Sequence, residues 1–160
     1  MFQAISKDII LKQIEQAFDG IPFPGAGHRS LYQAEAWDDY SIRGKERDHK
    51  GRWQDLPDQH ILDCQWALPH LDEVGLAYYL PAVMSFVLRE KGKQSGWIFS
   101  AIGHCLNIES PRNNPGRYQM GRLHFLNAEQ KRAVYAFVCY YFEEPAMTGR
   151  WLEAAYGKAC

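Results

Sequence analysis

The chain has 160 residues, of which 46% are hydrophobic and 23% charged, and its formal net charge is −1. This length and balance are typical of a single globular domain with a buried core. The near-zero charge does not give the basic footprint of a nucleic-acid-binding protein, so we do not expect a nucleic-acid partner.

The N-terminal segment and the cysteines predict a cytoplasmic protein. Residues 1–18 space their apolar side chains as one helix face and interrupt them with charges, which is unlike a signal peptide. We find no apolar run of about 18 residues, so no membrane span is expected. The four cysteines are widely spaced and form no CxxC pair, which predicts reduced thiols.

Two helices are expected in the first 40 residues. Ser6 is the predicted N-cap of a helix over residues 6–18. The segment 21–27 contains two prolines and two glycines, so it is predicted to be a connector. Ser30 is the predicted cap of a second helix, over residues 31–40.

Residues 41–53 form the most charged stretch, with five Lys or Arg residues between Arg43 and Arg52 and little apolar periodicity. One interpretation is a solvated loop whose end is held in the core by Trp53. The other is a contact loop, because loops on a rigid scaffold often carry binding residues. The partner-binding residues that we predict here are Arg43, Lys45, Arg47 and Trp53.

The longest continuous apolar stripe lies in residues 71–90, where Asp72 is the predicted N-cap. Pro81 lies in the middle of this stretch. It has no N–H donor, and its ring clashes with the carbonyl group four residues earlier. We therefore expect a proline-kinked helix, or two helices that meet at Leu80–Pro81.

Further helices are predicted on both sides of the central stretch, over residues 58–67, 97–106, 128–144 and 146–156. Asn127 and Gln130 have the spacing of a capping box, which fixes the start of the third of these helices. No segment alternates convincingly with the period of a strand. The fold class predicted is all-α: one domain over residues 1–160, built as a bundle of six to seven helices with a kinked central helix.

The tryptophans divide into two groups by position. We expect the core to absorb Trp66 and Trp97, together with Phe137. Trp37, Trp53 and Trp151 lie nearer loops or chain ends. The core is the default expectation for each ring, and any of them left in a shallow groove is a credible binding anchor.

Residues 107–121 contain two prolines, two glycines and three asparagines, a composition that predicts a second loop. A loop of this length is unusual in a compact domain and is often functional. We therefore add three partner-binding residues from it, which are Arg112, Arg117 and Tyr118.

A histidine and a cysteine, His60 and Cys64, are four residues apart on a predicted helix and so project from one face. His70 follows and His104 lies far along the chain, but no spacing matches a zinc signature. Buried structural thiols and incidental histidines explain the pattern better, so we expect no metal and no cofactor. The alternative is a small hydrolase or a metal-dependent enzyme that uses these residues.

Several motifs, taken together, resemble a family of small bacterial proteins of unknown function. They are Gly-Arg-Trp-Gln-Asp-Leu-Pro at 51–57, a Tyr-Leu-Pro-Ala stretch at 79–82, and Leu-x-x-Glu-Gln-x-x-Ala-Val at 126–134. Members of such families are often taken to be immunity-type proteins, which bind and neutralise a toxin of the same lineage. The resemblance implies a non-enzymatic protein that binds a protein partner, and it brings no catalytic residues.

Overall fold

The structure is a computed structural model that describes residues 5–38, 44–90, 97–106 and 123–141, and this part of the chain contains helices and no strand. The prediction of an all-α fold is confirmed. The α-helices are α1 (Lys7–Ala17), α2 (Leu31–Asp38), α3 (Asp58–Asp63), α4 (Glu73–Glu90), α5 (Trp97–Cys105) and α7 (Ala128–Tyr141). Three short 3₁₀ turns join them, η1 (Lys45–Arg47), η2 (Trp53–Asp55) and η3 (Leu68–His70). The helix predicted over residues 146–156 lies outside the described residues.

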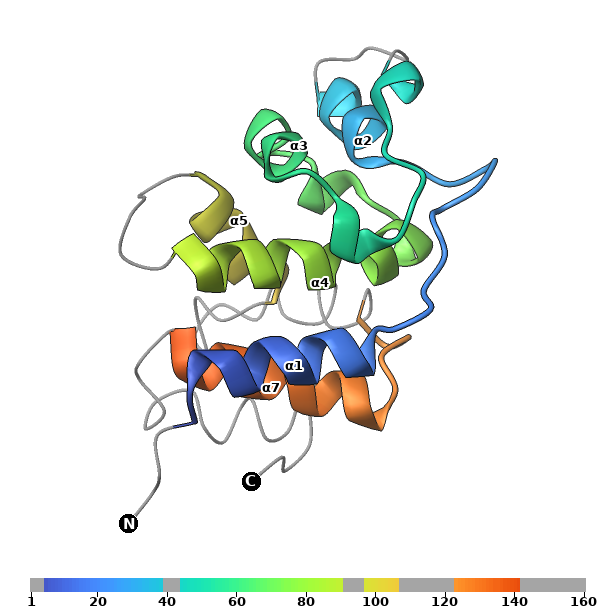
Figure 1. The fold of residues 1–160 in the computed structure, drawn as a ribbon. Coiled ribbons are helices and arrows are strands. Elements are labelled where there is room, and N and C mark those ends of the chain that lie inside the picture. Colours follow the sequence, from blue (N-terminus) through green and yellow to red (C-terminus); the bar gives the residue numbers. More distant parts are fainter. Residues whose placement is uncertain (1–4, 39–43, 91–96, 107–122, 142–160) are drawn as a thin grey trace.

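Helix α4 is the centre of the fold. Every residue from Tyr78 to Leu88 is buried, because helices cover it from several sides. Helices α1 and α7 lie together along one side of α4, and α2 and α3 lie on the other (Figure 1). Helix α5 contacts both α4 and η3. Within the described residues, no helix combines the length and the apolar composition needed to cross a bilayer.

Pro81 does not interrupt α4, which continues for 18 residues. Of the two alternatives predicted for this stretch, two separate helices is therefore wrong. Asp72 caps the helix as predicted, since its Oδ1 accepts a hydrogen bond from the Gly75 N–H at 2.8 Å. Packing on several sides stabilises a helix more than local preferences do, which explains why the helix tolerates the hydrogen bond that Pro81 cannot make.

The other predicted helix caps are also present. The Ser6 hydroxyl accepts from the backbone N–H of Ile9 at the start of α1. At the start of α7, the Gln130 N–H donates to Asn127 Oδ1 at 2.9 Å and the Asn127 N–H donates to Gln130 Oε1 at 3.0 Å. Because these bonds are reciprocal, they satisfy two backbone donors that the helix itself leaves unpaired.

The assignment of Trp66 and Trp97 to the core is wrong, because their side chains are 46% and 61% exposed. The predicted helix over residues 58–67 in fact ends at Asp63, so Trp66 lies in a turn after it. The two indole rings pack on each other at the surface instead, with centroids 4.8 Å apart. Phe137 is fully buried, as predicted.

Replacement of the α7 cap tests the role of the reciprocal hydrogen bonds. We expect Asn127→Ala to lower the free energy of unfolding by about 1 kcal/mol, the usual cost of losing an N-cap. Asn127→Ser keeps an accepting oxygen and should lose only a few tenths of that amount. Urea unfolding monitored by circular dichroism measures the stability of both variants. Equal losses would contradict the capping role of the Asn127 side chain.

Candidate functional site

The contact loop predicted over residues 41–53 lies in the connection between α2 and α3, and the structure describes it from residue 44 onward. We call residues 44–56 the contact loop below, and the core holds its end. Trp53 is only 4% exposed, and its indole N–H donates to the Phe18 carbonyl oxygen at 2.8 Å. Trp53 therefore holds the end of the loop in the core, which agrees with the interpretation of the sequence in which Trp53 is an anchor. Its buried ring is not presented at the surface to a partner.

A second anchor comes from the central helix. The Tyr78 hydroxyl donates to the carbonyl oxygen of Gly51 at 2.7 Å and lies 3.5 Å from that of His49. Burial raises the pKa of this hydroxyl to about 12, so it stays a neutral donor at physiological pH. The loop is thus fixed to α4, the most buried element of the fold.

The first half of the loop is tied to α2 and α3 through Arg47. Its guanidinium lies 3.3 Å from Asp63 Oδ2 and 4.4 Å from the centre of the Tyr32 ring. The Tyr32 hydroxyl donates to the same Asp63 carboxylate at 3.0 Å. A hydrogen bond from Gln59 lowers the pKa of Asp63, and the hydrogen bond from Tyr32 and the charge of Arg47 act in the same direction. This carboxylate is therefore ionised and able to hold the cation.

Gly44 lets the loop approach α2 closely. Its φ is +131°, and a Cβ atom there would lie 2.9 Å from the Tyr32 carbonyl oxygen. Any other residue would clash with this backbone and would also be strained, because side chains disfavour positive φ. The position therefore requires glycine for the loop to pass this close to α2.

Asp48 is the least satisfied group of the loop. Its Oδ1 is buried and has no hydrogen-bond partner in the described structure. Burial raises the pKa of this carboxyl group, against the opposing effects of a hydrogen bond with Ser30 and the charge of Lys50. The neighbouring His60 imidazole packs edge-on against the Tyr32 ring, and burial lowers its pKa. The inner side of the loop thus disfavours charge.

The outer side of the loop carries the cations. Lys45, Lys50 and Arg52 are exposed, and Arg52 lies 3.8 Å from Asp55 in a loose ion pair. The structure places Lys45 and Arg47, two of the predicted partner-binding residues, on η1. The others that we predicted, which are Arg43, Arg112, Arg117 and Tyr118, lie outside the described residues.

The candidate enzyme histidines lie on different elements, with His60 on α3, His70 on η3 and His104 on α5. Cys64 is 1% exposed, and burial, reinforced by the charge of Glu35, raises the pKa of its thiol to about 12. Cys105 is buried on α5 beside the exposed His104. Among the described residues, no group of three or more His, Cys, Asp or Glu side chains is arranged to hold a metal ion.

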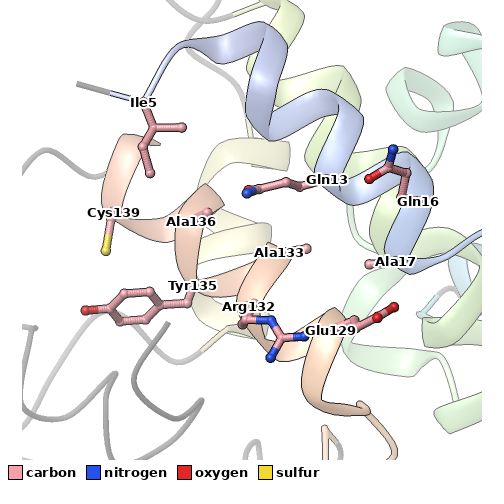
Figure 2. A pocket seen from close by; sticks show the side chains of 10 residues that line it. All are labelled: Ile5, Gln13, Gln16, Ala17, Glu129, Arg132, Ala133, Tyr135, Ala136 and Cys139. Atoms are coloured by element: carbon pink, nitrogen blue, oxygen red, sulfur yellow. The ribbon is translucent and has the colours of Figure 1, made fainter. Parts of the chain in front are cut away.

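A small hollow of about 260 Å³ lies between α1 and α7. Figure 2 shows Gln13 and Gln16 on the α1 side and Arg132 with Glu129 on the α7 side, with Cys139 at one end. Small alanine side chains form part of its lining. The amide, guanidinium and carboxylate side chains beside these alanines provide polar contacts. They are not by themselves the pair of nucleophile and base that covalent catalysis needs.

A more open hollow lies at the N-terminal end of α4. There, His28 Nδ1 lies 2.9 Å from Asp72 Oδ2, while Asp72 Oδ1 caps the helix. Arg29 donates to the His70 carbonyl oxygen at 2.8 Å. These bonds tie the connector after α1 to the start of α4, so they have a structural role.

Comparison with known families gives one match. Residues 6–149 match a family described as a family of unknown function (DUF6714), and the chain belongs to this family. No curated protein and no solved structure matches the chain. The match includes the whole of the contact loop.

The anchor from Trp53 can be tested by removing its donor. Trp53→Phe keeps a buried aromatic ring but removes the indole donor, which leaves the Phe18 carbonyl group with only the longer bond of 3.4 Å from the Ile21 N–H. We expect a loss of about 1–3 kcal/mol in the free energy of unfolding. The surface variant Trp37→Phe is the control and should stay within about 0.5 kcal/mol of the wild type. Chemical denaturation measures both, and an unchanged Trp53→Phe would contradict the anchor.

The raised pKa of Asp48 predicts that its ionised side chain lowers the free energy of unfolding at neutral pH. Its raised pKa means that its contribution to stability is greatest below the unfolded-state pKa and is lost as pH rises through the native pKa. Asp48→Asn should therefore be more stable than the wild type at pH 7, and the difference should shrink as the pH falls toward about 4. Unfolding curves over this pH range measure the difference. Asp55→Asn, at an exposed carboxylate of the same loop, is the control, and a trend of equal size there would contradict the assignment.

Proposed function

We propose that this member of the DUF6714 family is a non-enzymatic protein-binding domain, and that its partner is a toxin of the same bacterial lineage, which it neutralises as an immunity protein. The observation that carries the binding proposal is the contact loop 44–56, whose buried side is fixed to the scaffold and whose exposed side is basic. The toxin part rests on the resemblance of the sequence motifs to small bacterial proteins that are taken to be immunity-type.

The anchoring of the loop favours binding because it lowers the entropic cost of association. A free loop would lose conformational freedom when a partner ordered it. Here Trp53, Tyr78 and Arg47 each hold a different part of the loop to the scaffold. A partner would therefore meet a surface whose backbone is already ordered.

The charge of the loop indicates the kind of surface that it would meet. Exposed cations outnumber exposed acids in this stretch, whereas the whole chain has a net charge of −1: the cations are Lys45, Arg47, Lys50 and Arg52, and the acids are Glu46 and Asp55. A local positive patch attracts a partner with exposed carboxylates and speeds its association. We therefore expect an acidic contact surface on the toxin.

The alternative of a hydrolase has less support from the described side chains. A thiol acts as a nucleophile in its thiolate form. The thiol of Cys64 is buried and has a pKa of about 12, so it stays protonated at neutral pH. These observations favour binding over thiol chemistry.

The first experiment identifies the partner. The tagged protein is incubated with a lysate of its source organism, and bound proteins are identified by mass spectrometry with the neighbouring open reading frames in the search. We expect one stoichiometric partner whose expression alone arrests growth and whose toxicity is relieved by co-expression of this chain. A partner that is not toxic would overturn the immunity role, and failure to capture any partner would count against binding altogether.

The second experiment locates the interface. In Lys45→Glu/Lys50→Glu, two cations of the loop become anions, and we expect affinity for the partner to fall by about tenfold or more at low salt, mostly through slower association. Lys7→Glu/Lys12→Glu makes the same charge change on α1 and is the matched control. Surface plasmon resonance at two salt concentrations measures the rates. Circular dichroism checks that both double variants are folded. If both lower the affinity for the partner equally, the assignment of the interface to the loop is overturned.

A further inference from the structure

The hollow between α1 and α7 interrupts an otherwise close contact between the two helices. Ile14 of α1 and Phe137 of α7 are fully buried in the same core. Beside them the lining consists partly of small side chains, which are Ala17 on α1 and Ala133 and Ala136 on α7. Alanine fills less space than the larger apolar residues, so a space of about 260 Å³ remains. This volume is near the lower end for small-molecule pockets, about 300 Å³, and suits a small ligand.

Four polar side chains surround this space, Gln13 and Gln16 from α1 and Glu129 and Arg132 from α7 (Figure 2). None of these side chains makes a hydrogen bond or an ion pair within the part of the chain that the structure describes. Glu129 and Arg132 are three residues apart on one helix, a spacing that permits an ion pair, yet they do not pair with each other. Their charged groups are therefore available to a molecule that enters the hollow.

The types of these side chains indicate the class of ligand. The guanidinium group of Arg132 is a planar fork of donors that matches a carboxylate, and the Glu129 carboxylate accepts hydrogen bonds from an ammonium group. The two side chains begin about 5–6 Å apart on the helix, so they can contact two charged groups of one small molecule. The amides of Gln13 and Gln16 supply both donors and acceptors for its remaining polar atoms.

We propose that this hollow binds a small zwitterion of the class of free α-amino acids. The carboxylate of the ligand pairs with Arg132, and its ammonium group pairs with Glu129. A simple carboxylic acid would leave Glu129 without a partner, and a simple amine would leave Arg132 without one, so both are weaker ligands. The site contains no residue of the contact loop, so this binding does not depend on the function proposed above.

The exposure of the four polar side chains sets the affinity expected. All four are long and exposed, so each loses rotamer freedom when the ligand orders it. This ordering offsets part of the gain from the new ion pairs, and we expect a dissociation constant of about 0.1–1 mM. Because the ligand contacts both α1 and α7, it should also raise the melting temperature of the protein.

Isothermal titration calorimetry of the full chain at low salt, with a panel of free α-amino acids as the probes, tests the proposal. We expect at least one of them to bind. Its N-acetylated and decarboxylated analogues should each bind about tenfold or more weakly, because each lacks one of the two charges. A panel in which no amino acid binds at up to about 10 mM would overturn the proposal. Equal binding of the analogues would overturn the assignment to a zwitterion.

Charge-removing variants locate the site. In Glu129→Gln/Arg132→Gln both ion pairs with the ligand are lost, and we expect the affinity to fall by about tenfold or more. Lys12→Gln/Glu15→Gln removes the same two charges at the same spacing from exposed positions of α1, so it is the matched control. Thermal melting checks that both double variants are folded. Equal losses of affinity in the two would overturn the assignment to the hollow, and so would unchanged binding by the first.

A space-filling variant tests the site without removing any charge. Ala136→Leu keeps every polar group in place but fills part of the hollow, so we expect it to abolish binding of the amino acid. Leucine is a good helix former, so the substitution is compatible with α7. Wild-type affinity in this variant would overturn the proposal that the ligand occupies the hollow. Capture of a protein partner by the contact loop is a separate readout, so either proposal can fail without the other.

Discussion

The burial of α4 on several sides is the constraint on which the rest of the structure depends. A helix in this position can keep polar side chains only where each finds a partner, because an unpaired buried donor is costly. The Tyr78 hydroxyl donates to a carbonyl oxygen of the loop 44–56, and Asp72 accepts from the Gly75 N–H in the first turn of the helix. The same requirement that stabilises the core therefore also fixes the contact loop, since the loop supplies acceptors that the core needs.

Electrostatics divide that loop into two sides. Its inner side contacts buried groups, where the pKa of Asp48 is raised and that of His60 is lowered because burial disfavours both charged forms. Its outer side meets water and carries four exposed cations, Lys45, Arg47, Lys50 and Arg52, beside the exposed acids Glu46 and Asp55. Arg47 pairs with Asp63 and Arg52 with Asp55. The charged groups of the loop are therefore mostly on its exposed side, and its buried side is fixed to the scaffold.

The sequence predicts the helices and their caps well because both depend on neighbouring residues. The reciprocal bonds of Asn127 and Gln130 and the Asp72 cap follow from local spacing. The end of α3 at Asp63 depends on contacts with α2 that no local pattern carries, including the Tyr32–Asp63 hydrogen bond and the acceptance of the Trp66 N–H by Glu35. The burial of Trp53 and the exposure of Trp66 likewise depend on contacts between residues far apart in the sequence. Charge spacing indicates a basic loop, but its partners Asp63, Tyr78 and Phe18, which lie 16 to 35 residues away, decide which side chains face out.

Charge and backbone anchoring contribute differently to the binding that we propose for the contact loop. Charge is screened by salt over about 10 Å and mainly affects association rates, so the exposed lysines would act on the encounter with a partner. The anchors from Trp53 and Tyr78 are buried hydrogen bonds, which salt screens much less, and they lower the ordering cost of association. Varying the ionic strength therefore separates the two contributions.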